Sequence, residues 1–283
     1  YKFINHIAED ANGVLWAVGM PGVMKSTDGG VNWTRVSTSF VPFPGGEYFV
    51  AQTYRDLVRN VVVLEDNSVL ITVPFYSLGV WGYAYTNVYR TTDGGATWYI
   101  LFTQKNVDIV TMVEAQDKAL VFTDQDGRIY RFAQGVVAHV FSGDPRNMTA
   151  GPFLKTRNGA LYYVLNEEKK LRGVNEVVPT VYRSSDNGVT WSKAGNLPSG
   201  SSLIQQGDLL SEGDDGRLYL AVYTGCWSGA IYQSSDQGKK WEVTSGNVPG
   251  LSSFPSYPIY AIEEVNGKIL HSGTIGGVIF ATP

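Results

Sequence analysis

Short runs of β-branched and aromatic residues alternate with turns rich in Asn, Asp and Gly along the chain. Asn12-Gly13 precedes the apolar run Val14-Leu15-Trp16, and Asn158-Gly159 precedes Ala160-Leu161-Tyr162. Such turns beside apolar runs are typical of β-hairpins. No stretch shows a sustained 3.6-residue period, so we expect strands throughout and no helix longer than two turns.

This turn-and-strand pattern occurs six times. The turns begin at Asn12, Asn67, Asp117, Asn158, Asp215 and Asn266. Their spacing of 41 to 57 residues fits a four-stranded propeller blade with loops, which takes roughly 40–50 residues. Six turns therefore predict six blades.

A second pattern, Ser/Thr-x-Asp-x-Gly-x-x-Trp, occurs four times, beginning at Ser26, Thr91, Ser184 and Ser234. Its aspartate can accept hydrogen bonds from the backbone N–H groups that follow. Its glycine provides the positive φ of a tight return, and its tryptophan begins the next strand and packs on the neighbouring unit. We assign a structural role to Asp28, Gly30, Trp33, Asp93, Gly95, Trp98, Asp186, Gly188, Trp191, Asp236, Gly238 and Trp241.

The two patterns combine into a blade whose first turn is of the Asn/Asp type and whose third turn carries the aspartate motif. The third blade has Ala133-Gln134-Gly135 in place of the motif. The sixth blade reaches Val278-Ile279-Phe280-Ala281 and lacks a fourth strand, so we expect a partner chain or a missing segment to complete it. One propeller domain is predicted over residues 1–283.

The repeated motif resembles the Asp-box, or bacterial neuraminidase repeat, of the sialidase-like β-propeller superfamily. The resemblance implies an all-β, six-bladed propeller of mostly four-stranded antiparallel blades, with Asp-box turns between third and fourth strands. Proteins with this repeat include sialidases, xyloglucan-degrading hydrolases, sortilin-type receptors, photosystem assembly factors and tail or adhesion proteins. In them the Asp-box is structural and lies away from the binding face, so the resemblance indicates fold more than function.

Composition excludes several classes. The 283 residues carry a net charge of −4 without a run of Lys or Arg, which argues against a nucleic-acid partner. There is no stretch of 18 apolar residues, so membrane insertion is not expected. Cys226 is the single cysteine, and His6, His139 and His271 lack metal-ligand spacing. We expect no metal and no cofactor.

The two enzymatic interpretations differ in the charge of the sugar on which the enzyme would act. Sialidases of this resemblance use an arginine triad, a Tyr–Glu nucleophile pair and an Asp acid/base, and their first arginine lies in a Phe-Arg-Ile-Pro segment. This chain has Lys2-Phe3-Ile4-Asn5-His6 there and no arginine before Arg35, so an active sialidase is not expected. A hydrolase of neutral glycans needs two carboxylates about 5–10 Å apart. The candidates are Glu47, Asp56, Asp108, Asp144, Glu167, Glu168 and Glu176.

Long loops are expected on one face of the propeller, at residues 38–52, 74–86 and 166–179, with a shorter one at 223–229. Their aromatic side chains either pack on one another and plug the face, or form a recognition surface. The ligand-binding candidates are Phe43, Tyr48, Phe75, Tyr76, Trp81, Tyr83, Tyr85 and Trp227.

The function expected first is an extracellular or surface-displayed recognition or adhesion propeller, which binds a cell-surface glycan or protein through these aromatic loops. The alternative is a glycoside hydrolase that acts on a neutral or weakly acidic polysaccharide. A purely structural assembly domain is the third reading. A binding module would hold sugars without turnover, whereas a hydrolase would release reducing ends.

Overall fold

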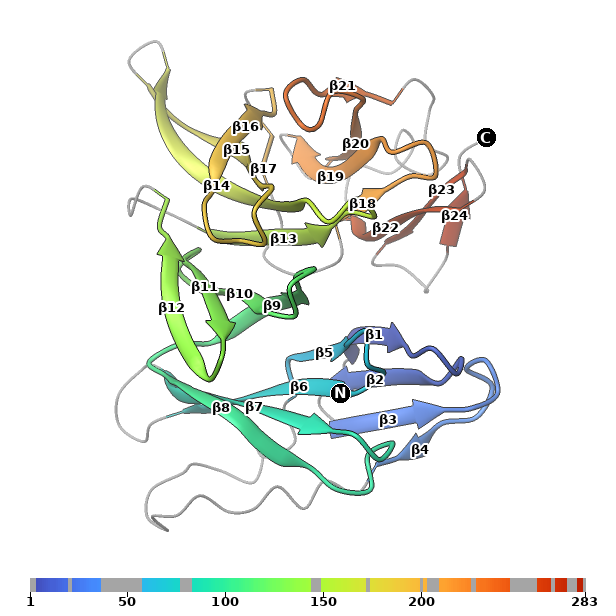
Figure 1. Cartoon of the computed structure of the whole chain (residues 1–283). Coiled ribbons are helices and arrows are strands. Elements are labelled where there is room, and N and C mark those ends of the chain that lie inside the picture. The colour runs from blue at the N-terminus through green and yellow to red at the C-terminus, as the bar shows by residue number, and fades with distance from the viewer. Residues whose placement is uncertain are drawn as a thin grey trace. The chain divides into compact units, whose positions relative to one another are not determined.

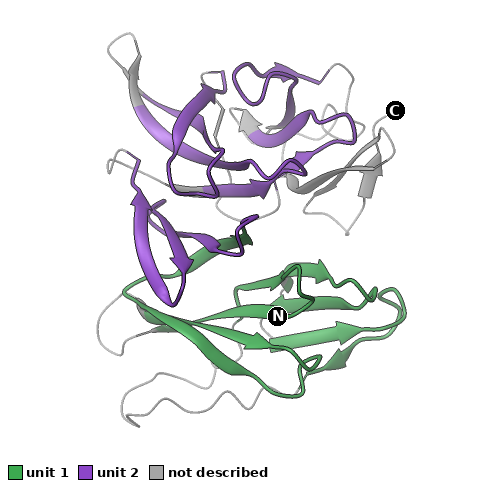
Figure 2. Cartoon of the chain, in the orientation of Figure 1, with its two compact units in different colours: residues 1–114 green, residues 115–283 purple. Residues whose placement is uncertain are grey.

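The computed structural model describes residues 4–19, 22–36, 58–76, 83–143, 149–171, 174–198, 201–202, 209–224, 228–244, 259–265, 268–273 and 279–281. They form the strands β1 to β24, joined by turns (Figure 1). The chain divides into two compact units, residues 1–114 and residues 115–283 (Figure 2). This division does not test the expectation of one propeller domain over residues 1–283, which stays a prediction.

Unit 1 contains the strands β1 to β9. They are β1 (Ile4–Glu9), β2 (Leu15–Gly19), β3 (Gly22–Ser26), β4 (Thr34–Arg35), β5 (Asn60–Val63), β6 (Val69–Tyr76), β7 (Tyr83–Thr91), β8 (Tyr99–Lys105) and β9 (Ile109–Glu114).

Unit 2 contains the strands β10 to β24. They are β10 (Leu120–Asp124), β11 (Ile129–Ala133), β12 (Val136–Phe141), β13 (Thr149–Lys155), β14 (Leu161–Leu171), β15 (Val174–Ser184), β16 (Ser192–Asn196), β17 (Ser201–Ser202), β18 (Leu210–Glu212), β19 (Leu218–Thr224), β20 (Ser228–Ser234), β21 (Glu242–Val243), β22 (Ile259–Val265), β23 (Lys268–Gly273) and β24 (Ile279–Ala281).

The strands pair in sequence order. Five sheets follow a path of four strands, namely β1–β4, β5–β8, β9–β12, β13–β16 and β17-β19-β20-β21, with β18 also paired to β19. The last sheet, β22-β23-β24, has three strands. The prediction of six blades is therefore wrong, and the structure has five four-stranded antiparallel blades.

The miscount has a physical cause. A connection between a first and a second strand, such as the one between β22 and β23, marks a strand pair and not a complete blade. Among the described residues, β24 pairs with β23 alone. A segment that completes this sheet stays a prediction.

The aspartate motifs lie between the third and fourth strands of four sheets, in the β3–β4, β7–β8, β15–β16 and β20–β21 turns. In the second sheet, Asp93 Oδ1 accepts the N–H of Thr97 at 2.9 Å, and the hydroxyl of Thr91 donates to the same carboxylate. Thr91 Oγ1 also accepts the N–H of Gly95 at 2.9 Å. The motif thus ties its turn to itself through side-chain acceptors.

The third sheet has a shorter connection at the same place. Gln134 and Gly135 join β11 to β12 with φ of 52° and 79°, respectively. Two successive positive φ values define a tight hairpin turn that matches the twist of the strands, so no aspartate is needed to close it.

The motif glycine also lets adjacent sheets approach. A Cβ on Gly95 would lie 2.9 Å from Val36 Cγ1 and 3.2 Å from the ring of Trp16. In unit 2, a Cβ on Gly188 would lie 2.8 Å from Val121 Cγ2. The turn of one sheet therefore packs on the second strand of the preceding sheet within each unit, and a larger side chain would separate them.

Each unit has its own apolar core. Buried side chains of the first two sheets pack together in unit 1: Trp16, Val18, Val23, Val36, Val58, Val61, Val69, Ile71, Val73 and Tyr89. Unit 2 buries a cluster that includes Tyr162, Val181, Leu220, Ile231 and Trp241. Alternate residues of the strands supply these clusters, as expected for sheets stacked face to face.

Candidate functional site

The clearest candidate site in unit 1 lies at the ends of strands away from the motif turns. Antiparallel pairing places the β6–β7 hairpin, the start of β5 and the start of β9 at the same end, because the Asn67 and Asp93 turns occupy the other end. This is the end at which the sequence predicts long loops.

An ion pair forms the centre of this end. Arg59 precedes β5 and lies 2.9 Å from the carboxylate of Asp108, which precedes β9. The side chain of Asp108 is 4% exposed and that of Arg59 is 25% exposed. A carboxylate this deeply buried is stable in its charged form only beside such a cation or donor.

Aromatic side chains lie on the adjoining hairpin. The rings of Phe75 and Tyr85 stack with centroids 4.7 Å apart and planes inclined by 20°. Thr86, next to Tyr85, donates its hydroxyl to the carbonyl of Val107 at 2.5 Å. The stacked rings are thus connected through one hydrogen bond to the segment that carries Asp108. We call Arg59, Phe75, Tyr85, Thr86 and Asp108 the Arg59–Asp108 cluster.

The tyrosines of this hairpin are in a low-dielectric environment. Burial, with a smaller contribution from neighbouring Tyr89, raises the pKa of Tyr85 to about 12. Burial also raises the pKa of Tyr89, although a hydrogen bond from the Asn87 amide opposes the rise. Both phenols are therefore neutral at physiological pH and can act as hydrogen-bond donors but not as nucleophilic phenolates.

The ligand-binding candidates fall into two groups. Phe75 is half-buried and Tyr85 is buried, and they pack on each other. Tyr76 and Tyr83 are opposite each other in the β6–β7 ladder. Four candidates lie outside the described residues: Phe43, Tyr48, Trp81 and Trp227.

The candidate carboxylates are similarly divided. Asp108 belongs to unit 1, and Glu167, Glu168 and Glu176 belong to the β14–β15 hairpin of unit 2. Glu47, Asp56 and Asp144 lie outside the described residues. Asp108 is therefore the one candidate carboxylate of unit 1 among the described residues.

Glu167 is the most buried of the three glutamates. Its carboxylate accepts hydrogen bonds from the hydroxyls of Thr180, at 2.7 Å, and Tyr182. Thr180 also bonds the side chain of Asn196 at 3.1 Å. The ring of Phe141 packs on Tyr182, with centroids 4.7 Å apart. This network ties β14, β15 and β16 together, as a polar group inside a sheet must be tied.

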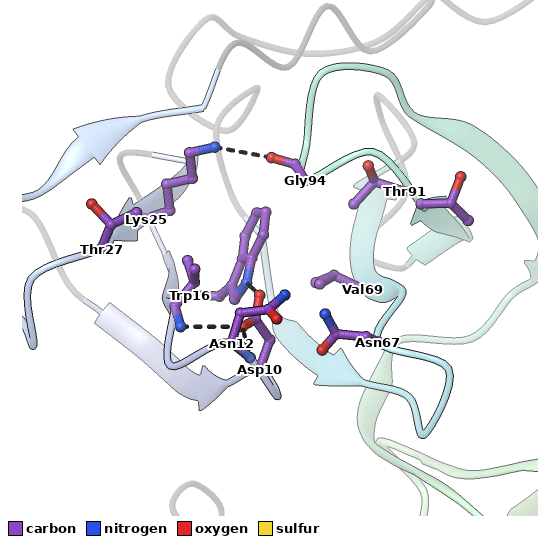
Figure 3. A pocket seen from close by; sticks show the side chains of 11 residues that line it. Asp10, Asn12, Trp16, Lys25, Thr27, Asn67, Val69, Thr91 and Gly94 are labelled. Atoms are coloured by element: carbon purple, nitrogen blue, oxygen red, sulfur yellow. Dashed lines mark hydrogen bonds between the residues drawn. The ribbon is translucent and has the colours of Figure 1, made fainter.

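A pocket of about 240 Å³ lies on the other side of unit 1, where the turns of the first two sheets meet (Figure 3). Asp10, Asn12, Trp16 and Lys25 of the first sheet line it, together with Asn67 of the second. Lys25 extends across the pocket and donates to the carbonyl of Gly94 at 3.1 Å (Figure 3).

Asp10 organises the floor of this pocket. Its Oδ1 accepts the N–H groups of Asn12 and Val14 at 2.9 and 3.1 Å, and its Oδ2 accepts the indole N–H of Trp16 at 3.1 Å. Trp16 is 1% exposed and meets Trp98 edge to face at 6.4 Å. The floor is rigid because each of its polar atoms has a fixed partner.

Sequence reasoning missed Arg59 and the pocket. A signal for Arg59 exists, since it directly precedes the apolar run Asn60-Val61-Val62-Val63 of an inner strand. The pocket has no such signal in a single turn, because its lining comes from two sheets whose packing only the structure provides.

The described residues hold no group of three or more His, Cys, Asp or Glu side chains that could bind a metal ion. Likewise, no helix in the described part of the chain is long and apolar enough to span a membrane. His6 Nδ1 is 2.8 Å from the carbonyl of Val61, and His139 Nε2 is 2.9 Å from the hydroxyl of Ser142, so each ring has a local structural partner.

Antiparallel four-stranded sheets that follow one another along the chain define the class of protein, an all-β β-propeller. Comparison with known proteins agrees with this class. No protein-family model matches the chain. The xyloglucanase Xgh74A of Acetivibrio thermocellus is 26% identical over 231 residues, which are 81% of this chain and 22% of that protein. The chain thus spans about a fifth of the length of the curated relatives it matches.

Solved structures of similar fold are more distant in sequence. YCF48 bound to D1 peptide has a TM-score of 0.60 at 18% identity, over 99% of this chain and 78% of that one. An ancestral GH74 enzyme has a TM-score of 0.62 at 14% identity, over 96% and 35%. The α-L-arabinofuranosidase Arb93A of Fusarium graminearum, in complex with an iminosugar inhibitor, has a TM-score of 0.56 at 14% identity, over 98% and 92%. These likenesses show the propeller fold.

Proposed function

We propose that this chain is a carbohydrate-active propeller of the glycoside hydrolase type, acting on a neutral polysaccharide. The observation that carries the proposal is the similarity to a xyloglucanase over 81% of the chain. The fold neighbours include a GH74 enzyme and an α-L-arabinofuranosidase. This was the alternative in the sequence analysis, and the comparisons favour it over adhesion.

The Arg59–Asp108 cluster is the site we assign to the sugar in unit 1. Asp108 would supply a carboxylate that accepts a hydrogen bond from a sugar hydroxyl or acts on the scissile bond, and Arg59 would hold this carboxylate in place through the ion pair. The stacked rings of Phe75 and Tyr85 would form the wall beside this carboxylate, with the half-buried Phe75 as the more accessible ring. The aromatic candidates outside the described residues, Phe43, Tyr48, Trp81 and Trp227, stay predictions of ligand contact.

The second carboxylate is part of this proposal. Hydrolysis with retention needs two carboxyl groups about 5–5.5 Å apart, and hydrolysis with inversion needs them about 6.5–9.5 Å apart. Glu47 and Asp56 are the other candidate carboxylates within residues 1–114, and each is tested by substitution.

A second candidate function is recognition without turnover. The fold neighbour YCF48 is described with a bound peptide, which favours a binding propeller for a protein segment or a glycan. In either function the ligand would be met outside the cell or at its surface, since polysaccharides of this kind are extracellular.

The test is a glycan array followed by incubation with xyloglucan and with arabinan. Release of reducing ends is quantified and the products are identified by mass. The hydrolase proposal expects release that falls at least 100-fold in Asp108→Asn and in either Glu47→Gln or Asp56→Asn, while Glu176→Gln on the unit 2 hairpin keeps wild-type activity. Binding without release by any variant would favour recognition. If the protein neither binds any glycan nor releases reducing ends from one, both carbohydrate functions are overturned.

A further inference from the structure

The pocket between the first two sheets lies at a position that recurs along the chain. In the first four sheets, a residue of the third strand lies opposite the second-strand residue that is four positions after Asn12, Asp66, Asp117 or Asn158. These cross-strand pairs are Trp16–Lys25, Leu70–Arg90, Val121–Arg131 and Tyr162–Arg183. The third-strand residue is a cation in these four sheets, whereas the fifth sheet has Gln233 opposite Tyr219.

Two sheets close this position with an ion pair. Arg90 bonds the carboxylate of Asp66 in the second sheet, and Arg131 bonds that of Asp117 in the third. Arg131 also donates from Nε to the carbonyl of Asn187 at 3.1 Å, so its guanidinium spans from its own turn to the motif turn of the following sheet. A planar, forked donor is suited to two acceptors at once.

The first sheet has Lys25 and Asn12 at these two positions. Lys25 makes the contact to the following motif turn, at Gly94, but Asn12 offers an amide in place of a carboxylate. A lysine amine is a single point of donation and leaves unfilled the space that a guanidinium would occupy. This is the space of the pocket in Figure 3.

The chemistry of the pocket is polar and electrically balanced. Lys25 and Asp10 contribute one charge of each sign, while the amides of Asn12 and Asn67 and the hydroxyl of Thr92 are neutral donors and acceptors. Val69 and Trp16 also line the pocket, but they are 2% and 1% exposed and offer little apolar surface. A small neutral ligand that has several hydroxyl groups fits this lining.

The size of the pocket limits the ligand. Sites for drug-sized molecules have volumes of roughly 300–1,000 Å³, and this pocket has about 240 Å³. It is therefore suited to one ring. Because the first two sheets are parts of the same unit, the lining residues have fixed relative positions.

We infer that this pocket is a second carbohydrate site, which holds a single neutral sugar residue and takes no part in bond cleavage. The choice of sugar class rests on the proposed function. The site is separate from the Arg59–Asp108 cluster, because the two lie at opposite ends of the same strands of the second sheet. Such a site would hold a side branch or a neighbouring stretch of the polysaccharide.

The repeats also provide the test. The double substitution Asn12→Asp with Lys25→Arg copies the Asp117–Arg131 arrangement and fills the pocket with an ion pair, without removing packing from the core. Asn158→Asp makes the same chemical change at the equivalent turn of the fourth sheet and serves as the matched control. Thermal unfolding confirms that each variant is folded.

The binding of methyl xyloside, methyl arabinoside and methyl galactoside is measured by saturation-transfer difference NMR and by titration. We expect one of the three to bind the wild type and Asn158→Asp equally, and to bind the double variant at least tenfold more weakly. No binding of any of the three to the wild type would overturn the inference, as would equal binding to the double variant.

The same probes separate this inference from the proposed function. Asp108→Asn should lose hydrolysis of xyloglucan and arabinan and keep methyl glycoside binding, while the double variant should keep hydrolysis and lose that binding. If the protein hydrolyses the polysaccharides but the double substitution leaves methyl glycoside binding unchanged, the second site is refuted and the hydrolase function is not. A protein that binds methyl glycosides through the pocket but never releases reducing ends refutes the hydrolase alone.

Discussion

The amine of Lys25 donates a hydrogen bond to the carbonyl oxygen of Gly94 at 3.1 Å, and so joins the third strand of the first sheet to the motif turn of the second. Arg131 makes the same connection to Asn187 in unit 2. In these two sheets the third-strand cation is thus a link between sheets as well as a surface charge. Its partner is a backbone carbonyl, which any residue at that position would provide.

This link predicts a modest and asymmetric effect on stability. Lys25→Met should lower the free energy of unfolding by about 0.5–1.5 kcal/mol, the usual net contribution of one hydrogen bond. Arg131→Met should cost more, because it also leaves Asp117 without its guanidinium. Urea unfolding followed by tryptophan fluorescence measures both. Equal losses for the two variants would contradict this assignment.

Substitution of Gly94 and of Gly95 distinguishes the cost of backbone strain from the cost of overpacking. Both have positive φ, +67° and +88°, but a Cβ on Gly94 meets nothing within 4 Å, while one on Gly95 would lie 2.9 Å from Val36 Cγ1. Gly94→Ala should cost about 1–2 kcal/mol from the left-handed backbone alone. Gly95→Ala should cost about 1–3 kcal/mol more through overpacking. Thermal unfolding of the two variants, compared directly, tests whether the motif glycine is a packing residue.

The sequence predicted the motif turns well because their determinants are local. Asp93, Thr91 and Gly95 lie within five residues, and the hydrogen bonds among them are those that short-range turn chemistry implies. The number of blades depends instead on whether a last strand finds a partner. A run such as Ile279–Ala281 has the same composition with or without a fourth strand beside it, so the pattern alone gave one blade too many.

The candidate sites were less predictable for a related reason. Asp108 was a candidate as a loop carboxylate, but its burial against Arg59 depends on two segments 49 residues apart in the sequence. Phe75 and Tyr85 were candidates as exposed aromatics, yet they stack on each other. Single-sequence reasoning finds residue types at turns, whereas long-range packing decides which of them are accessible.

Acid should weaken the motif turns. The pKa of Asp28 is lowered to about 2, chiefly by the backbone N–H of Asn32, and that of Asp93 is lowered to about 2, chiefly by the hydroxyl of Thr97. An unfolded aspartate has a pKa of about 3.9. Because the folded pKa is lower, these carboxylates stabilise the fold above pH ~4, and their contribution is lost as the pH falls toward 2.

Melting temperatures between pH 2 and pH 6 measure this dependence. Asp93→Asn keeps the shape and one acceptor oxygen but cannot titrate, so its melting temperature should fall less steeply below pH 4 than that of the wild type. Lys105→Gln on an outer strand is the control and should reproduce the wild-type slope. A slope in Asp93→Asn as steep as in the wild type would show that this motif does not account for the acid sensitivity.

The motif tryptophans should differ in importance according to burial. Trp241 is 7% exposed within the unit 2 core and donates its indole N–H to Gly238 at 3.0 Å. Trp33 makes the equivalent bond to Gly30 at 2.9 Å but is half-buried. Trp241→Ala should therefore cost about 3–5 kcal/mol, and Trp33→Ala roughly 1–3 kcal/mol. Chemical denaturation gives both values, and the reverse order would contradict the packing described for unit 2.

The buried pair of Arg59 and Asp108 supports the last prediction, which separates structural from functional roles. Arg59→Met alone leaves the carboxylate of Asp108 buried beside an apolar side chain and should cost about 3–5 kcal/mol. Arg59→Met combined with Asp108→Leu removes both charges and should recover most of that loss, because an apolar pair of similar volume often replaces a buried ion pair without penalty. Urea unfolding of the wild type, both single variants and the double variant measures the coupling. The folded double variant is then assayed on xyloglucan and arabinan. If Asp108 serves the reaction, the double variant is stable but releases no reducing ends. If the double variant hydrolyses both polysaccharides at the wild-type rate, the Arg59–Asp108 pair is structural and the catalytic site lies elsewhere.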